Sequence, residues 1–446
     1  MRKRKNCIVG ALLAAMIMCA MIAVFALQST VAPQCFRSNH PARTAAFLTH
    51  APIHIIGDAD FTVAKGVTGG SGTSTDPYII EGWDVNASHA DGISIENTRS
   101  YFVVASCFVH DGGDYNSGIV LFNSTNGRIA DNLCSNDYWG IGLFLSNYST
   151  VVNNTCTDGF YGMYLLYCGN ELIRDNNCSN NVEAMYIWYT SNSSVLSNDC
   201  SSDSVGIQLD TSDNNTVGGN ECDSTDYGIA AAVSSDNIIE NNNCSSDTMC
   251  GIFLSSSTRN YLIGNNCSAG SQYGIWIVDG GNNTLTINNC SRNAVYGIFL
   301  LLTDNNTVTF NKLCNNSRFG VFLGFVTNAN IVVNNTFIGN NGATVAYDAD
   351  HSQACDNGTG NLWNTSGNPH GYGNWWSDWT TPDANYDGVV DVPHAINGSA
   401  GAQDHYPLAN TSQVPIPEFG MMPLAAVLVV LSLIMLMGAD CRRKKH

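Results

Sequence analysis

The pattern of apolar and polar positions repeats along the middle of the chain with a period of 22 or 23 residues. Each repeat contains a Gly, an aliphatic residue directly after it and usually another aliphatic residue two positions further on. Such alternation predicts a short β-strand with one buried face. The glycines are Gly118, Gly140, Gly162, Gly206, Gly228, Gly251, Gly274, Gly297 and Gly320, with Ala184 in the one gap.

A second set of positions keeps the same period. It begins with an apolar file made of Ile129, Val151, Ile173, Val195, Val217, Ile239, Leu262, Leu285, Val308 and Ile331. Three residues later comes an Asn file made of Asn132, Asn154, Asn176, Asn198, Asn220, Asn242, Asn265, Asn288, Asn311 and Asn334. Two residues after these stand Cys134, Cys156, Cys178, Cys200, Cys222, Cys244, Cys267 and Cys290, followed by Leu313 and Thr336.

Ten repeats of nearly fixed length indicate a stacked solenoid. Leucine-rich repeats have a similar length, but they need a Leu-rich consensus that this chain lacks. Short strands separated by Asn, Gly, Ser and Asp favour an all-β parallel β-helix, with coils about 4.8 Å apart along the axis. Equivalent residues then lie above one another. Asn side chains pass hydrogen bonds between coils, and Gly suits a corner where a side chain would collide or φ is positive.

The cysteine file has three interpretations. Seventeen Cys in an exported chain would ordinarily indicate disulfides. Stacked Cα atoms are close enough for a disulfide, but parallel side chains point in the same direction. Because Cys is also among the most buried residue types, free thiols in the core are favoured, with disulfides and a soft-metal site as alternatives. Cys168, Cys250 and Cys355 lie outside the file and are better disulfide candidates.

Both ends of the chain carry long apolar runs. The first, within residues 1–30, follows the basic residues 2–5 and predicts an export signal or an uncleaved anchor. The second, residues 421–439, precedes the basic tail 440–446, a pattern typical of a transmembrane helix with a cytoplasmic tail. We therefore expect a membrane partner and a region between the two runs that lies outside the cell, at its surface.

Asn-x-Ser/Thr triplets agree with export and glycosylation, although they arise easily in a chain rich in these residues. Examples are Asn123, Asn147, Asn192, Asn282, Asn305, Asn364 and Asn410. The charge excludes another class of partner. With 37 acidic and 18 basic side chains the formal net charge is −19, and most cations lie at the two ends. Nucleic-acid binding needs clustered cations, so no nucleic-acid partner is expected.

The regular coils cover residues 118–342. Residues 49–117 are predicted to form an N-terminal cap with irregular first coils, where Ile93 and Ile95 imitate the later aliphatic pairs. A C-terminal cap is expected over residues 343–410, followed by a linker at 411–420. Solenoids need such caps because their open ends would otherwise expose strand edges and core.

Two features of the C-terminal cap suggest binding. Trp375, Trp376 and Trp379 either cover the last coil or offer rings for stacking on carbohydrate. The stretch "DANYDGVVD" spaces oxygen ligands as a Ca²⁺ loop does, with Gly388 at the sixth position, although His394 replaces the usual acid at the twelfth. The predicted Ca²⁺ ligands are Asp383, Asn385, Asp387, the carbonyl of Val389, and Asp391.

The coils resemble those of the NosD-like right-handed parallel β-helix proteins, also described as carbohydrate-binding and sugar-hydrolase β-helix domains. The blocks "PIHIIGDADF" and "GNWWSDWTTPDANYDGVVDVPH" are similar to those of archaeal surface members, and the resemblance covers residues 50–408. "PIPEFG" before the last apolar run resembles archaeal sorting signals, which implies replacement of the tail by a lipid anchor. The family name also implies copper delivery to nitrous oxide reductase, but the ten His show no metal-ligand spacing.

Three functions are compared. A non-catalytic, membrane-anchored surface protein that binds glycans or cell-envelope components is favoured. The first alternative is a polysaccharide lyase or glycoside hydrolase, which needs a cationic base or paired carboxylates. Its best constellation is His110 with Asp111 and Asp114, since scattered acids are assigned to solvated turns: Asp210, Asp213, Asp226 and Asp247. The second alternative is a copper-related accessory protein.

Overall fold

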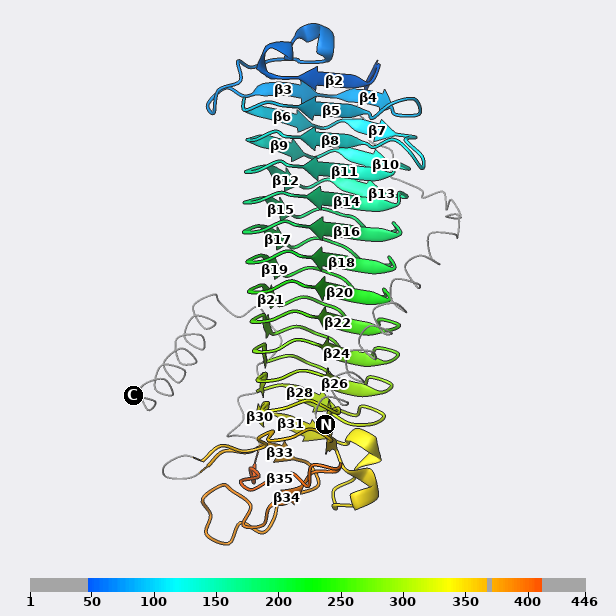
Figure 1. Cartoon of the computed structure of the whole chain (residues 1–446). Coiled ribbons are helices and arrows are strands. Elements are labelled where there is room, and N and C mark those ends of the chain that lie inside the picture. The colour runs from blue at the N-terminus through cyan, green and yellow to red at the C-terminus, as the bar shows by residue number, and fades with distance from the viewer. Residues whose placement is uncertain (1–46, 367–370, 411–446) are drawn as a thin grey trace, which may run out of the picture. The chain divides into compact units, whose positions relative to one another are not determined.

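The computed structural model describes residues 47–366 and 371–410, which form an all-β, right-handed parallel β-helix (Figure 1). The predicted β-helix is confirmed for these residues. The predicted signal or anchor at 1–30, the linker at 411–420, the transmembrane segment at 421–439 and the tail at 440–446 lie outside the described residues. Among the described residues, no helix is long and apolar enough to cross a membrane.

Three parallel sheets follow the stack of coils, and we name them the long, second and third sheets. The long sheet, which runs through the middle of Figure 1, contains β2 (Ile53–Ile56), β5 (Ile93–Glu96), β8 (Ile119–Phe122), β11 (Trp139–Phe144), β14 (Tyr161–Leu166), β16 (Glu183–Trp188), β18 (Val205–Asp210), β20 (Tyr227–Ala232), β22 (Cys250–Ser255), β24 (Tyr273–Val278), β26 (Tyr296–Leu301), β29 (Val321–Leu323) and β32 (Ala354–Asp356).

The second sheet contains β3 (Tyr78–Glu81), β6 (Phe102–Ala105), β9 (Gly127–Ala130), β12 (Thr150–Val152), β15 (Leu172–Arg174), β17 (Ser194–Leu196), β19 (Thr216–Gly218), β21 (Ile238–Glu240), β23 (Tyr261–Ile263), β25 (Thr284–Thr286), β27 (Thr307–Thr309) and β30 (Ile331–Val333). The third sheet contains β1 (Leu48–His50), β4 (Trp83–Asn86), β7 (Phe108–His110), β10 (Leu133–Ser135) and β13 (Thr155–Thr157). Single bridges then continue this side of the coils.

The remaining elements belong mostly to the two caps. A short sheet contains β28 (Lys312–Cys314), β31 (Thr336–Ile338) and β33 (Trp375–Trp376), while β34 (His394–Ala395) and β35 (Gln403–Asp404) form an antiparallel pair. Four single-turn 3-10 helices are η1 (Asp58–Asp60), η2 (Val63–Lys65), η3 (Asn340–Gly342) and η4 (Ala349–His351).

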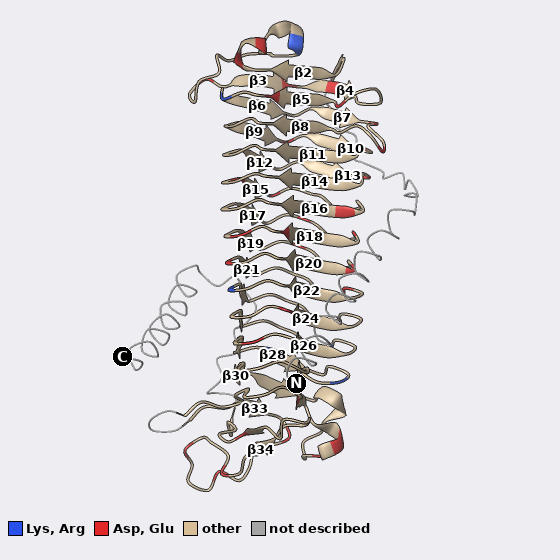
Figure 2. Cartoon of the chain, viewed as in Figure 1, with Lys and Arg blue, Asp and Glu red and all other residues tan. Residues whose placement is uncertain are grey.

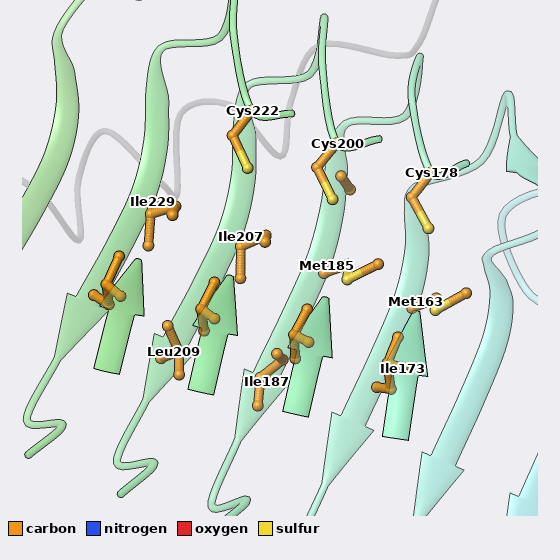
Figure 3. Packing of buried hydrophobic residues seen from close by; sticks show 14 of the residues in the cluster. Met163, Ile173, Cys178, Met185, Ile187, Cys200, Ile207, Leu209, Cys222 and Ile229 are labelled. Carbon is orange, nitrogen blue, oxygen red and sulfur yellow. The ribbon is translucent and has the colours of Figure 1, made fainter. Parts of the chain in front are cut away.

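Equivalent residues of successive coils lie in register, as the repeat predicts. Cys134 is the direct partner of Cys156 in the third sheet. In the core, Cys178, Cys200 and Cys222 follow one another from coil to coil (Figure 3). Each repeat is therefore one coil of the solenoid.

The Asn file forms a buried ladder of hydrogen bonds. The backbone N–H and the side-chain Nδ2 of Asn198 donate to Oδ1 of Asn220 at 2.9 and 3.0 Å. Nδ2 of Asn220 also donates to the carbonyl of Val195 at 3.0 Å. Since a buried polar group without a partner costs about 1–3 kcal/mol, the ladder removes a repeated penalty at this corner. A second ladder, which we did not predict although its Asn residues are spaced almost as regularly, runs through Asn215, Asn237, Asn260, Asn283, Asn306, Asn330 and Asn361.

The last predicted repeat is one residue out of register. Asn335, and not Asn334, accepts from Nδ2 of Asn311 at 3.0 Å, a separation of 24 residues. Val332 and Phe337 likewise replace the predicted members of the apolar and cysteine files, which were Ile331 and Thr336. The chain offers two adjacent Asn here and a Val beside the Ile, so the periodicity alone cannot choose between the two registers.

The glycine file is explained by close approach. A Cβ on Gly140 would lie 2.7 Å from the Cβ of Cys156 and 2.7 Å from the carbonyl oxygen of Gly162. The prediction that Gly avoids a steric collision at this corner is therefore confirmed. Positive φ falls elsewhere in the coil, at residues such as Asn153, with φ 56°, and Tyr167, with φ 55°.

The described cysteines are all free and buried. The prediction that Cys168, Cys250 and Cys355 are disulfide candidates is therefore wrong for this structure. The Sγ of Cys168 donates to the carbonyl of Leu143 at 3.3 Å, and the Sγ of Cys250 donates to that of Ile252 at 3.1 Å. Burial raises the pKa of Cys168 to about 12, so this side chain is a thiol at neutral pH.

Both caps continue the solenoid. In the N-terminal cap, Ile93 and Ile95 pair in register with Ile119 and Leu121, as expected. At the other end, pairing continues past residue 342, and Phe337 is the partner of Trp376. These two rings stack with centroids 4.1 Å apart. The cysteine file therefore ends in progressively larger apolar side chains, which close the core.

Candidate functional site: the outward face of the long sheet

Aromatic side chains gather on the outward side of the long sheet. In β14, Met163 and Leu165 point into the core and are fully buried, whereas Tyr161 and Tyr164 point outward and are half-buried. The same division recurs in neighbouring coils, so outward rings stand above one another along the sheet. Aromatic rings that stack in this way bury each other's faces and leave their edges to solvent.

Rings from three successive long-sheet strands and their turns form what we call the first aromatic platform. Trp139 lies 5.3 Å from Tyr164 and 4.8 Å from Phe144, measured between ring centroids. Trp188, the last residue of β16, extends these ring contacts to Tyr186 and Tyr189. The platform consists of Tyr138, Trp139, Phe144, Phe160, Tyr161, Tyr164, Tyr167, Tyr186, Trp188 and Tyr189.

Rings from β20 to β29 form the second aromatic platform. Trp276 lies between Phe253, at 4.7 Å, and Phe299, at 5.8 Å with an interplanar angle of 10°. The platform consists of Tyr227, Phe253, Tyr273, Trp276, Tyr296, Phe299, Phe319 and Phe322. The two platforms lie on the same face of the same sheet but do not touch through any recorded ring contact among the described residues.

The coil between the platforms has no outward aromatic ring. In β18 the outward positions hold Val205, Gln208 and Asp210, and in β20 two of them hold Ala230 and Ala232. We call Glu183, Gln208 and Asp210 the polar strip. Polar and small side chains therefore separate two aromatic surfaces on an otherwise continuous sheet.

The carboxylates of the polar strip have different surroundings. Asp210 accepts hydrogen bonds from the hydroxyl of Tyr186 at 3.3 Å and from that of Thr211 at 3.0 Å. No described residue hydrogen-bonds to the carboxylate of Glu183, and burial raises its pKa to about 7. Oε1 of Gln208 is enclosed and has no hydrogen-bond partner among the described side chains and backbone groups. The prediction that Asp210 lies on a solvated turn is wrong, because it is the last residue of β18.

The strands of the long sheet contain no Lys or Arg, and Figure 2 shows no blue on their arrows. Acidic residues do occur there: Glu183 and Asp210 lie beside the platforms, and Glu96 and Asp356 lie in β5 and β32. Arg318, in the turn before β29, is close enough to the second platform to oppose the rise in the pKa of Tyr273 that burial causes. The face is thus aromatic and acidic, without a cation in any of its strands.

A further set of acids lies inside the coils, at the turn that precedes the long sheet. Asp247 was predicted on a solvated turn, but it is fully buried and accepts the backbone N–H of Thr225 at 2.9 Å. Burial raises the pKa of Asp247 to about 9 and that of Glu171, on another corner, to about 8. These acids act as rungs of hydrogen-bond ladders in positions where other coils use Asn, Ser or Thr.

The predicted catalytic constellation lies on the third sheet. The Nδ1 of His110 is 2.8 Å from Asp111, and its Nε2 is 2.9 Å from Asp84, a residue that sequence reasoning did not single out. Asp114 is exposed in the loop that follows, and no contact with the imidazole is recorded. The structure therefore brings together two of the three predicted residues and adds a carboxylate.

The tryptophans of the C-terminal cap differ in exposure. Trp376 is fully buried, and its Nε1 donates to Asp404 at 2.9 Å, so it covers the last coil and presents no free face. Trp379 is half-buried and donates to the carbonyl of Val392 at 2.9 Å. Trp375 is half-buried in β33.

The predicted Ca²⁺ loop is closed by its own hydrogen bonds. The carboxylate of Asp383 accepts the N–H groups of Asp387 at 3.2 Å and Gly388 at 3.1 Å. Asp391 accepts the N–H of Ala384 at 2.7 Å. Within residues 47–366 and 371–410, no three His, Cys, Asp or Glu side chains are grouped as a metal site. The Ca²⁺ site remains a prediction. His394, at its twelfth position, is buried and stacked on Trp376 at 4.2 Å.

Sequence reasoning missed the aromatic face, although a signal was present. A Tyr directly precedes the repeat glycine at positions 161, 227, 273 and 296. An aromatic residue stands two positions after the glycine, or after Ala184, at positions 164, 186, 253, 276, 299 and 322. Reading the residue between the two buried aliphatics as outward would have placed both files on one surface.

These features define a parallel β-helix protein with an aromatic outer face that is interrupted by a polar strip. The chain belongs to the NosD family, since the family model described as "Periplasmic copper-binding protein (NosD)" matches residues 70–243 and 183–381. A search of curated proteins finds no significant match.

Several solved structures are similar in fold. A double mutant of the periplasmic alginate epimerase AlgG is 15% identical, with a TM-score of 0.42 over 51% of this chain and 77% of that chain. The Dettilon tailspike protein is 15% identical, with a TM-score of 0.46 over 56% and 59%. The A-module of the Azotobacter vinelandii mannuronan C-5 epimerase AlgE6 is 12% identical, with a TM-score of 0.42 over 63% and 85%. These values support no statement about activity.

The family's description names copper, and the cysteine file contains the side chains of this chain that could bind it. The cysteine file offers the soft ligands that copper prefers. However, its thiols are fully enclosed in the core, and the described residues contain no group of three His, Cys, Asp or Glu side chains placed to hold a metal ion. The described residues therefore do not fit a copper site.

Proposed function

We propose that this protein is a non-catalytic, membrane-anchored surface β-helix that binds saccharide chains on the outward face of its long sheet. The observation that carries the proposal is the pair of aromatic platforms on that face. Saccharide rings present apolar C–H faces that stack on aromatic rings, and their hydroxyl groups hydrogen-bond to nearby polar side chains. Two platforms on one sheet suit an extended chain that lies along the solenoid.

A purely structural explanation of the aromatic files is the stabilisation of neighbouring coils by ring stacking. That explanation predicts rings in every coil, because every coil has a neighbour to stack on. β18 instead carries Gln208 and Asp210 at its outward positions, and the coil remains in register with β16 and β20. The interruption therefore favours a surface shaped for a ligand.

The arrangement of acids disfavours hydrolysis. Glycoside hydrolases hold their two carboxyl groups roughly 5–9.5 Å apart. Glu183 and Asp210 lie near opposite ends of adjacent strands, since Asp210 is the partner of Trp188, five residues after Glu183. At about 3.3 Å per residue, this places them about 16 Å apart along the strand direction. His110 already has a carboxylate at each ring nitrogen, which leaves no free nitrogen to accept a proton from a substrate.

The location of the proposed binding face follows from the two ends of the chain. The predicted export signal in residues 1–30 and the predicted transmembrane segment 421–439 support an ectodomain outside the cell, at its surface. The family's description as periplasmic supports the same side of the membrane. We include Ca²⁺ as a proposed structural ion of the loop at 383–391, where it would stiffen the C-terminal cap.

Screening the full-length, detergent-solubilised protein on a glycan array, with Ca²⁺ and with a chelator, tests the proposal. We expect binding that is lost when Trp188 and Trp276 are replaced by Ala. Binding that depends instead on Trp375 and Trp379 would move the site to the cap. Turnover of a polyuronate or of any bound glycan would contradict the proposal that the protein is non-catalytic. A melting temperature that does not change with Ca²⁺ would contradict the proposed Ca²⁺ site.

A further inference from the structure

We infer that the polar strip recognises amino-sugar units with free ammonium groups within the bound saccharide chain, and that Glu183 and Asp210, about 16 Å apart along the strand direction, each meet a different unit. The inference rests on the proposed function, because it assigns a ligand chemistry to the same face. It goes beyond that function by naming the sign of the charge that the face selects. Three features of the described residues support it.

The first feature is that the strip presents hydrogen-bond acceptors with unused capacity. The carboxylate of Glu183 has no hydrogen-bond partner in the described part of the chain, although it lies among half-buried rings. The carboxylate of Asp210 accepts two hydroxyl groups and has lone pairs left for a ligand. An ammonium group donates three hydrogen bonds and complements such acceptors better than a hydroxyl group does.

The second feature is the aromatic surroundings of the strip. Glu183 is the direct strand partner of Tyr161, whose ring lies 5.9 Å from that of Tyr186. Tyr186 in turn lies 6.1 Å from Trp188, beside Asp210. Aromatic faces attract cations through their quadrupole. Carboxylates placed among aromatic rings are thus suited to a cationic group.

The third feature is the absence of cations from the strands of the long sheet (Figure 2). A uronate chain would bring negative charge onto a face that already carries Glu183 and Asp210, in a protein with a formal net charge of −19. Nothing in these strands would neutralise that charge, since the long-sheet strands from β11 to β26 contain no Lys or Arg. The face should therefore reject uronate chains and attract amino-sugar chains.

The burial of Glu183 adds a pH dependence. Its pKa is raised to about 7 by burial, and the groups that face it are Tyr161, Tyr164, Tyr186 and Asp203. A bound cation stabilises the ionised carboxylate, so binding of a permanently charged ligand should strengthen as the pH rises through about 7. The acid form of Glu183 would still donate or accept one hydrogen bond but would lose the charge attraction.

The experiment uses calorimetry on the full-length protein in detergent with three hexasaccharides: glucosamine, N-acetylglucosamine and galacturonate. We expect the glucosamine hexamer to bind about tenfold more tightly than the acetylated hexamer at low salt, and no binding of the galacturonate hexamer. Glu183→Gln combined with Asp210→Asn should abolish the tenfold preference without loss of the acetylated ligand. The matched control, Glu221→Gln with Glu240→Gln, removes two charges outside the long sheet and should keep the preference.

The outcomes separate this inference from the proposed function. Equal binding of both hexamers, or a preference that survives in the polar-strip variant, overturns the inference and leaves glycan binding intact. Failure of all three sugars to bind contradicts the proposed function itself. A trimethylated glucosamine hexamer, whose charge does not titrate, should bind several-fold more tightly at pH 8 than at pH 6. A flat pH profile that is the same in Glu183→Gln would contradict the role of this carboxylate.

Discussion

The inner and outer sides of the long sheet share the same strands and the same period, yet they follow different rules. In β24 the inward residues are Ile275 and Ile277, and in β18 they are Ile207 and Leu209, all fully buried. The outward residues of the same two strands differ in kind, with the rings of Tyr273 and Trp276 in β24 and the amide and carboxylate of Gln208 and Asp210 in β18. The inside repeats because each coil packs against copies of itself. The outside is free to vary, so its pattern reflects what it meets in solution.

The largest effect is expected from breaking an inner ladder. Asn220→Ala removes the acceptor for two donors of Asn198 and the donor to Val195, and it leaves buried groups unpaired. The substitution also removes the side-chain donor to Oδ1 of Asn242, so we expect the free energy of unfolding to fall by about 3–5 kcal/mol, from four lost hydrogen bonds. Denaturant titration measures this, with the outward substitution Gln208→Ala as the control, for which a change below about 1 kcal/mol is expected.

The next largest effect is a pH-dependent change in stability, caused by a buried acid on the inner side of the coils. The pKa of Glu171 is raised by burial from 4.5 to about 8, so the folded state holds a proton that the unfolded state has released between these values. Its contribution to stability is therefore full below about pH 4.5 and declines as the pH rises toward about 8. Glu171→Gln lacks this decline, and the ladder still has an acceptor for the N–H of Ser149.

We expect the Glu171→Gln variant to match the parent at pH 4.5 and to exceed its stability by roughly 2–4 kcal/mol at pH 9, on the order of 1.4 kcal/mol per pKa unit. Thermal or denaturant unfolding across this pH range provides the measurement. Other buried acids, such as Asp247, are present in both proteins and cancel in the difference. If the parent and the variant were equally stable at pH 9, the carboxyl group of Glu171 would not be buried in the way that the structure shows.

Replacing one tryptophan in each aromatic platform tests whether the outer side of the long sheet binds the ligand. Trp188→Ala and Trp276→Ala should weaken binding of a glucosamine hexamer by about 1–2 kcal/mol each, since exposed rings at a binding surface contribute energies of this order. The melting temperature should change little compared with Trp363→Ala, which empties a fully buried site in the cap. Unchanged affinity in both platform variants would assign the rings to coil stacking alone.

The smallest effect concerns the thiols. The described cysteines are free, so reducing agent should leave the melting temperature of the protein unchanged. Mass spectrometry of the denatured protein should find the thiols of Cys156, Cys178 and Cys200 all available for alkylation. A fall in melting temperature on reduction, together with blocked thiols, would show that coils are linked covalently.

The sequence predicted the inner side well because one residue type recurs at each place in the coil. The Asn and Cys files and the glycine corner could be read directly from the spacing. It failed at Asn335 because Asn334 offers an equally good register one residue earlier. It also missed the ladder around Asp247, where Asp, Asn, Thr and Gly alternate and no single residue type marks the file.

The outer side could be predicted only in part, for a physical reason. A residue between two buried aliphatics points outward whatever its type, so an aromatic ring there gives no signal from burial. The gathering of rings into two platforms depends on the register of separate coils, which only the three-dimensional structure provides. The tryptophan cluster of the cap was conspicuous in sequence, yet Trp376 serves the core.

The central claim is that the outward aromatic face of the long sheet is the binding surface, and ¹⁹F NMR of the 5-fluorotryptophan-labelled full-length protein tests it most directly. Assigned by single Trp→Phe substitutions, the resonances of Trp139, Trp188 and Trp276 should shift on titration with a glucosamine hexamer. Those of Trp363 and Trp376, buried in the C-terminal cap, should stay in place. Shifts confined to the cap tryptophans, with the three platform resonances unmoved at saturating ligand, would contradict the claim.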